Sequence, residues 1–283
     1  MVEHRSAIHR ILPHIILSIG VLVLVFPVWI AFVASTHDAA TVINGEFGLI
    51  PGAYFLENYG RALFTGSART TREPVLTMLA NSFVMAMTVA IGKILISVVS
   101  GFAVVYFKFP FRMTIFWMIF ITLMLPVEVR IYPTYKVVSD LGLLDTYSGL
   151  TVPLIASATG TLLFRQFFMT VPDELIEASK IDGAGPWKFF WDTLVPLSLT
   201  TSAALFVIQF IYGWNQYLWP LLITTKDSMQ TIVIGIKKMI VTQDALTEWQ
   251  IAMATAVLAM LPPVIVVVVM QRLFVKGLVE TEK

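Results

Sequence analysis

Long stretches of this chain carry almost no charged side chain, and this feature constrains its fold most. Residues 193–225 contain no charged residue, and residues 74–107 contain only Lys93. A helix needs about 20 apolar residues to cross the hydrocarbon core of a bilayer. Charged residues make up 13% of the whole chain, whereas soluble domains carry about 25%. The pattern therefore predicts an all-α polytopic membrane protein.

Six charge-poor runs predict about six transmembrane helices in a single membrane domain over residues 1–283, with its core at 74–275. The expected spans are residues 12–34, 78–106, 113–133, 146–164, 193–225 and 249–271. An even number of spans places both termini on the same side of the membrane. Arg5 and Arg10 precede the first span, and Lys108 and Arg112 fill the short second connection. Because Lys and Arg concentrate in cytoplasmic flanks, we expect cytoplasmic termini.

The connections between these runs differ in length and polarity. Residues 35–75 form the longest polar segment, and we expect an external loop with a short helix at 55–63. A second external excursion covers 226–248, where residues 232–240 fit a strand or a helix equally well. With six spans, the fourth connection, residues 172–196, lies in the cytoplasm.

Several functional classes are disfavoured by composition. Cysteine is absent, which excludes disulfides and cysteine-ligated metals. The four histidines lie near the N-terminus, and their spacing does not align them on one helix face, so no metal site is expected. The net charge of +1 suggests no nucleic-acid partner. No catalytic residue is expected, because no His or Cys constellation lies within the spans.

The fourth connection contains the sequence EASKIDGAGPWKFFWDTLVP at residues 177–196. Gly183 permits the positive φ of a sharp reversal, and Pro186 fits the first turn of a new helix. The segment therefore predicts a helix, a turn and a second helix, in which Phe189, Phe190 and Leu194 can seat in a cleft. Alternatively, the hairpin is an amphipathic loop that packs on its own bundle.

The hairpin resembles the EAA loop of ABC importer permeases, through Glu177-Ala178-Ser179, Asp182-Gly183-Ala184, Phe190 and residues 194–197. Other segments of the chain carry the same resemblance: Asn81-Ser82, residues 124–126 with Glu128 and Pro133, residues 214–220, and residues 271–275 with Gly277. Together they resemble the carbohydrate-type, maltose-permease-like branch of that family. Ser179, Thr200 and the C-terminal tail depart from the usual pattern, the first of them only mildly.

The resemblance implies the type I ABC importer permease fold in the bacterial inner membrane. It also implies a heterodimer with a second homologous permease, two copies of an ABC ATPase and a periplasmic solute-binding protein. ATP and Mg would bind the ATPases, and this chain would bind no cofactor; it carries no G-x-x-x-x-G-K-[ST] phosphate loop. The residues implied in ATPase coupling are Glu177, Ala178, Ser179, Asp182, Gly183, Ala184 and Phe190. The implied solute is glycerol-3-phosphate or a related glycerophosphodiester, with a neutral oligosaccharide or polyol as the alternative.

Polar residues at membrane depth usually face a cavity or a partner. We take Lys93, Glu128, Arg130, Asn215 and Gln216 as candidates for the translocation pathway. Lys93 fits either a cation facing the pathway or a structural pair with a carboxylate of the partner permease. Arg130 fits a phosphate contact or an ion pair with the binding protein. Asn215 and Gln216 fit solute contacts, unless the neighbouring aromatics form an interfacial belt.

Two other classes of protein remain as alternatives. A stand-alone secondary transporter would be expected to show inverted repeats and broken spans, and it would not need an EAA hairpin. A membrane-embedded hydrolase would need a His, Cys or Ser/His constellation at depth, but the histidines lie at the wrong end of the chain.

Overall fold

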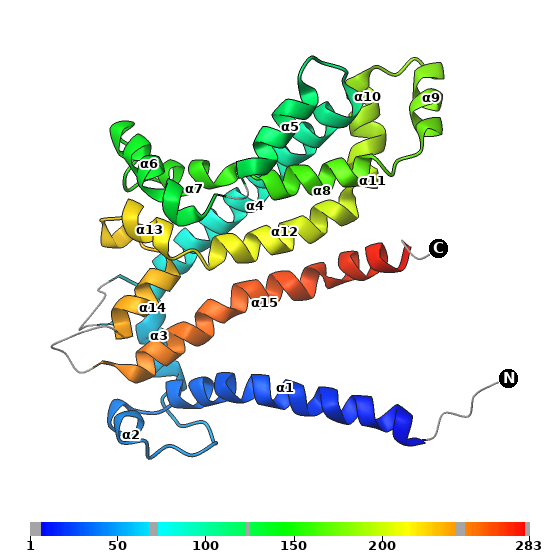
Figure 1. The fold of residues 1–283 in the computed structure, drawn as a ribbon. Coiled ribbons are helices and arrows are strands. Elements are labelled where there is room, and N and C mark those ends of the chain that lie inside the picture. Colours follow the sequence, from blue (N-terminus) through cyan, green and yellow to red (C-terminus); the bar gives the residue numbers. More distant parts are fainter. Residues whose placement is uncertain (1–6, 68–72, 123–124, 241–246, 281–283) are drawn as a thin grey trace. The chain divides into compact units, whose positions relative to one another are not determined.

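The structure is a computed structural model that describes residues 7–67, 73–122, 125–240 and 247–280, and this part of the chain is helical without a strand (Figure 1). The α-helices are α1 (Ala7–Ser35), α2 (Ala39–Asn44), α3 (Phe55–Phe64), α4 (Val75–Tyr106), α5 (Arg112–Ile121), α6 (Val127–Asp140), α7 (Tyr147–Ile155), α8 (Ala158–Phe168), α9 (Asp173–Ile181), α10 (Pro186–Phe189), α11 (Val195–Leu197), α12 (Leu199–Trp214), α13 (Leu218–Ile223), α14 (Ile232–Ile240) and α15 (Trp249–Glu280). A π-helical turn, η2 (Phe190–Leu194), and a 3₁₀ turn, η3 (Asp227–Met229), complete the set. The all-α prediction is confirmed.

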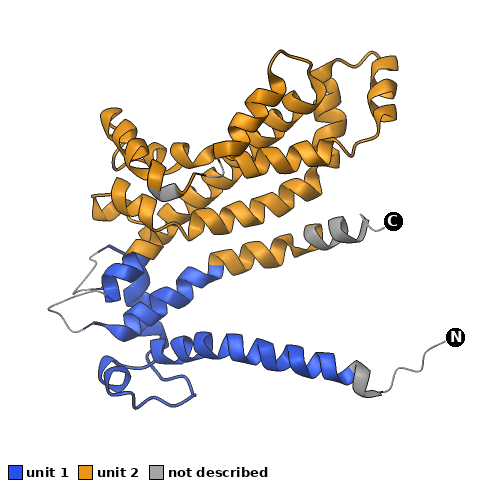
Figure 2. Ribbon diagram, in the orientation of Figure 1, with its two compact units in different colours: residues 1–76, 235–261 blue, residues 77–234, 262–283 orange. Residues whose placement is uncertain are grey.

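Contacts divide the chain into two compact units (Figure 2). Unit 1 comprises residues 1–76 and 235–261, and unit 2 comprises residues 77–234 and 262–283. A single permease domain over the whole chain, with its periplasmic and cytoplasmic loops, stays a prediction.

Unit 1 contains the long polar segment after α1, which is held by buried hydrogen bonds. The Asn58 amide of α3 donates to the backbone carbonyls of Ser35, at 2.9 Å, and His37, at 2.8 Å. Arg61 forms an ion pair with Glu248 at 2.7 Å, and Glu248 also accepts a hydrogen bond from Ser67. The helix predicted at 55–63 is therefore present as α3, in a loop with a defined structure.

Unit 1 also holds a helix that the sequence reading missed. Asp38 accepts hydrogen bonds from the backbone N–H groups of Ala40 and Thr41, and it thereby caps α2. An aspartate at this position is a recognised helix-start signal, so the sequence did carry the information. Residues 232–240, which fitted a strand or a helix, form α14.

Unit 2 packs around α4, and glycines allow close helix contacts there. A Cβ on Gly92 would lie 2.8 Å from the Ile155 side chain of α7. A Cβ on Gly213 of α12 would lie 2.9 Å from the Ala86 Cα of α4. Because a methyl group at either position would clash, these glycines set how closely α7 and α12 approach α4.

The sequence predicts about six spans, and the described residues contain three to five candidates. By length and composition, three helices of the described residues could cross a membrane: residues 11–35 of α1, all of α4, and residues 249–273 of α15. Two more crossings are possible if each bent pair counts as one: α7 with α8, at 44°, and residues 186–197 with α12, at 68°.

The expected third span is absent as a continuous helix. The run at 113–133 is divided into α5, which has 10 residues, and α6, which begins after Pro126. Proline has no N–H to donate and disfavours the helical conformation in the residue before it, so the break near Pro126 has a local cause. The run at 193–225 is likewise interrupted, because α12 ends at Trp214 and α13 begins at Leu218.

Candidate functional site: an exposed hairpin and a cationic cavity

The hairpin predicted at 177–196 is present, and its turn is a Schellman motif at the end of α9. The N–H of Gly183 donates to the carbonyl of Lys180 at 3.0 Å, and the N–H of Ala184 donates to that of Ser179 at 2.9 Å. Gly183 has a φ of +68°, the left-handed conformation that this motif requires. Pro186 then occupies the first turn of α10. The predicted order of a helix, a turn and a second helix is confirmed.

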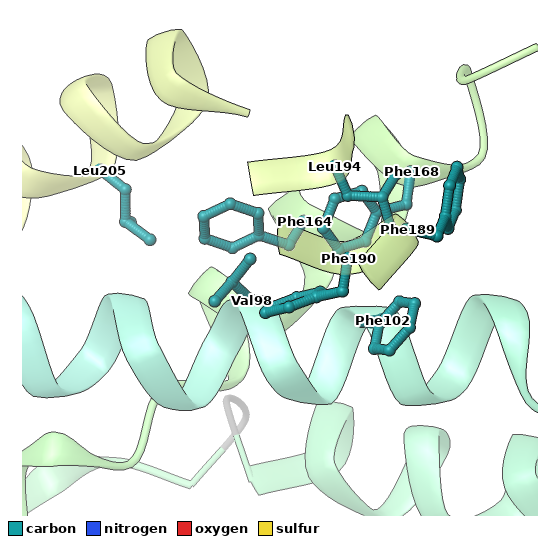
Figure 3. Close-up of a cluster of buried hydrophobic side chains, with 8 residues drawn as sticks. All are labelled: Val98, Phe102, Phe164, Phe168, Phe189, Phe190, Leu194 and Leu205. Atoms are coloured by element: carbon teal, nitrogen blue, oxygen red, sulfur yellow. The ribbon is translucent and has the colours of Figure 1, made fainter. Parts of the chain in front are cut away.

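The second arm of the hairpin is anchored in the core of unit 2. Figure 3 shows Phe189, Phe190 and Leu194 together with Phe102 of α4 and Phe164 of α8. Phe190 is 1% exposed, and its ring centroid lies 4.8 Å from that of Phe102. The three side chains expected to seat in a cleft therefore pack in this chain's own core. The alternative reading, a loop packed on its own bundle, holds for this arm.

A π-helical turn at Phe190–Leu194 joins this arm to α11, where the N–H of Val195 donates to the carbonyl of Phe190. Pro196 follows at once. A proline ring clashes with the carbonyl four residues earlier in an α-helix, and a wider turn relieves that clash. π-Helical turns occur frequently at functional sites.

The first arm, in contrast, offers a free surface, because no residue of α9 is buried. Glu177, Ala178, Asp182 and Gly183 are exposed, whereas Ser179 and Ala184 are half-buried. Ile181 is 85% exposed and Trp187 is 60% exposed, so both present large apolar side chains at the tip. The geometry therefore separates an anchored arm, which includes Phe190, from an exposed arm that carries the other predicted coupling residues.

The second part of the site is a cluster around Lys93 of α4, which is 8% exposed. Its Nζ donates to Gln209 Oε1 of α12 at 2.8 Å and lies 4.0 Å from the ring centroid of Tyr212. Neither ion pair found among the described residues involves Lys93. An amide and an aromatic ring therefore hold this ammonium, and neither removes its charge.

Lys93 and Arg130 of α6 line the same cavity, whose volume is about 640 Å³. Gln209, Tyr212 and several hydroxyls from the start of α8 complete its wall. A second cavity of about 170 Å³ is lined by Lys93, Arg130 and Gln216 among others. The structure thus brings together three of the five predicted pathway residues.

The remaining pathway candidates are placed differently. Asn215 is an exposed residue at the C-terminus of α12. Glu128 lies in α6, but its side chain is outside the described residues. Trp214 and Trp219 are 3% and 4% exposed, and the Trp219 Nε1 donates to the carbonyl of Leu150 at 3.2 Å. These two tryptophans therefore belong to the core, and the interfacial-belt reading does not fit them.

Sequence reasoning missed Gln209 and Tyr212 as partners of Lys93. Gln209 was visible as a polar residue inside an uncharged run, but its distance from Lys93 along the chain concealed the contact. No group of three or more His, Asp or Glu side chains suited to a metal ion is found among the described residues.

Comparisons with known proteins agree with this architecture. Residues 93–280 match the family model described as "Binding-protein-dependent transport system inner membrane component". The chain is 57% identical over its full length to a full-length sn-glycerol-3-phosphate transport system permease protein UgpE of Agrobacterium fabrum, and 55% identical in the same way to one of Yersinia pestis. The relative from Brucella melitensis is 56% identical over the same extent.

A solved structure has the same fold. It is a bacterial ABC transporter involved in the import of the acidic polysaccharide alginate, with a TM-score of 0.81, and the match covers 96% of this chain and 98% of that one at 22% identity. With the family model matching over half of the chain, and with full-length relatives above 50% identity, this chain belongs to the family of inner-membrane permease components of binding-protein-dependent ABC importers.

Proposed function

We propose that this chain is the permease subunit through which a bacterial ABC importer takes up sn-glycerol-3-phosphate, or a related glycerophosphodiester. The observation that carries the proposal is identity of 55–57%, over the full length of both chains, to permease proteins of sn-glycerol-3-phosphate transport systems. Such a solute is anionic, and the cavity lined by Lys93 and Arg130 has the charge that would attract it.

In this proposal the chain is not an enzyme: it supplies half of the pathway and binds no cofactor. A second permease completes the pathway, a periplasmic binding protein delivers the solute, and two ATPase subunits bind ATP and Mg. Both termini lie in the cytoplasm, as does the hairpin of α9 and α10. Support for this arrangement comes from the family match, which is to an inner-membrane component of binding-protein-dependent transport systems.

The hairpin couples the ATPases to the pathway in this proposal. A rigid element can transmit a rigid-body movement, and the burial of Phe189, Phe190 and Leu194 supports a firm attachment to α4 and α8. The exposed face of α9, with Ile181 at its end, supplies a surface for docking. Movement of an ATPase against α9 would therefore be passed to the helices that line the cavity.

The test is transport by the reconstituted complex. The chain is co-expressed with its second permease, the ATPases and the binding protein, and the complex is placed in proteoliposomes. We expect ATP-dependent uptake of sn-glycerol-3-phosphate that requires every partner. Uptake of a neutral oligosaccharide or polyol in its place would support the alternative substrate, and uptake by this chain alone would indicate a stand-alone secondary transporter.

A further inference from the structure

We infer that the cavity lined by Lys93 and Arg130 is an anion subsite that receives the phosphate of the solute, with Gln209 and Tyr212 as positioning residues for Lys93. The identity of the ligand rests on the proposed function. The charge selectivity of the cavity does not, because it follows from the side chains alone.

The first step is the state of Lys93. An ammonium has three donors, and one of them is used by Gln209 at 2.8 Å. The Tyr212 ring, 4.0 Å from Nζ, stabilises the cation through its face and accepts no proton. Among the described residues no other side chain accepts a hydrogen bond from Nζ, so two donors and the positive charge remain for a ligand. A lysine held by an aspartate or glutamate would have its charge balanced already.

The second step is the composition of the cavity wall. Lys93 and Arg130 both line it, and none of the described lining residues is acidic. Ser157 and Thr159, at the start of α8, add hydroxyl groups. The volume of about 640 Å³ falls within the range of roughly 300–1,000 Å³ that is usual for small-molecule sites. Two cations and several hydroxyls without an opposing described carboxylate fit an anion with hydroxyl groups.

The third step is the choice among solutes. A phosphate monoester carries about −1.5 to −2 charges at pH 7 and presents three strong acceptor oxygens. Charge-assisted hydrogen bonds from Lys and Arg to phosphate are among the stronger ones in proteins. A neutral polyol could accept hydrogen bonds from these side chains, but it would not balance their charges, and the burial of the Lys93 charge is costly. The cavity therefore fits a small phosphorylated solute better than a neutral sugar.

The role of Gln209 follows from its contact. It is 7% exposed and reaches Lys93 from α12, whereas Lys93 lies on α4. The amide oxygen orients the ammonium without neutralising it. A glutamate at position 209 would have nearly the same shape and would place a carboxylate where the amide now lies. This single change tests whether the ammonium must stay unbalanced by a neighbouring carboxylate.

The absence of cysteine from the chain makes the cavity accessible to a direct test. A single cysteine is introduced in the wall as Thr159→Cys, and the control is Ala53→Cys at an exposed position in unit 1. The reconstituted complex is treated with a negatively charged or a positively charged methanethiosulfonate of similar size. The modification rate is read on this chain alone, and each rate is divided by that of the control.

We expect the normalised rate of the anionic reagent to exceed that of the cationic reagent about tenfold, since charged clefts raise the local concentration of the opposite charge by this order or more. Lys93→Gln should remove most of this preference, and so should Gln209→Glu. Lys93→Arg should retain it, and Lys136→Gln, which removes an exposed cation of α6, should leave it unchanged. Added sn-glycerol-3-phosphate should slow the modification, whereas glycerol at the same concentration should not.

The outcomes separate this inference from the proposed function. Equal normalised rates for the two reagents would overturn the subsite, even if the complex transports sn-glycerol-3-phosphate. A clear preference without protection by that solute would overturn the phosphate assignment. If the preference is lost in Lys93→Gln but kept in Gln209→Glu, the inferred role of Gln209 as a neutral partner of Lys93 is overturned. If Lys93→Gln prevents assembly, Arg130→Gln at an exposed position supplies the same test. Ser100→Cys supplies a second reporter in the cavity wall. If neither Thr159→Cys nor Ser100→Cys reacts, the inference is also overturned.

Discussion

The Schellman turn at Gly183 allows the coupling role of the hairpin to be tested with a matched pair of substitutions. Gly183 has a φ of +68°, and a Cβ built there meets no atom within 4 Å. A side chain at this position therefore costs backbone strain alone. For an L-residue the left-handed conformation costs about 1–2 kcal/mol, and Asn pays less because its side chain bonds locally. Gly183→Val should be strained, whereas Gly183→Asn should be tolerated.

The size of the expected effect on coupling follows from the backbone strain at position 183. A cost of about 1.4 kcal/mol lowers the ratio of native to rearranged turn about tenfold. Because the hydrogen bonds from Gly183 and Ala184 to the end of α9 depend on this turn, its loss would change the angle of α9 against the anchored α10. We expect the number of solutes transported per ATP hydrolysed to fall several-fold in Gly183→Val, with the complex still assembled.

The assay measures uptake and ATP hydrolysis in the same proteoliposomes, with Gly183→Asn as the control for size and polarity. The reasoning would be refuted by an unchanged transport-to-hydrolysis ratio in Gly183→Val. It would also be refuted if Asn and Val lowered the ratio equally, because strain in the left-handed region would then not be the cause.

Three further predictions concern side-chain packing, a close helix contact and the hydrogen bonds of Asp145. Phe190→Ala should lower the stability of the chain by about 3–5 kcal/mol, which melting curves would measure. Trp187→Ala should leave the thermal stability nearly unchanged but weaken association with the ATPase, which co-purification would measure. Gly213→Ala should destabilise the purified permease by about 1–3 kcal/mol through overpacking, because its methyl would meet the Ala86 backbone, and an unchanged melting temperature would contradict the contact. Hydrogen bonds from the Thr225 hydroxyl and the Lys226 N–H lower the pKa of Asp145 from 3.8. The stability that ionised Asp145 contributes is therefore present above pH about 3.8 and is lost as the pH falls through the lower folded pKa. Acid melting curves of Asp145→Asn should lack that loss, and curves identical to those of the unmodified chain would contradict the prediction.

The features that could be predicted from the sequence were those that depend on neighbouring residues. Gly183 and Pro186 carry their backbone requirements with them, so the reversal between α9 and α10 was readable. Lys93 was conspicuous because it is the only charge in a long apolar run. Its partners Gln209 and Tyr212 lie more than a hundred residues away along the chain, and only the packing of α12 on α4 brings them together.

The interrupted spans were not predicted, and the reason is physical. Hydropathy adds up apolar side chains over a window and does not register a change of direction. The run at 113–133 is apolar before Pro126 and charge-poor after it, but the helix is broken there. In the run at 193–225, α12 ends before Asn215 without any charge to mark the end.

The burial of the aromatic residues in the hairpin also depended on the three-dimensional structure. Phe190 is 1% exposed, whereas its neighbour Trp191 is 59% exposed. Which of the two faces the core depends on the phase of the helix, and the π-helical turn at Phe190–Leu194 shifts that phase. A regular 3.6-residue period gives no warning of this shift.

The central claim is that the exposed arm of the hairpin docks on a separate ATPase, and one cross-linking measurement tests it directly. The cysteine-free chain receives Ile181→Cys at the exposed end of α9, and the complex with all its partners is treated with a short bifunctional thiol–amine reagent. The account predicts a covalent product of this chain with the ATPase subunit, and no such product from Ala53→Cys. An intact, transporting complex in which Ile181→Cys forms no product with the ATPase would contradict the account.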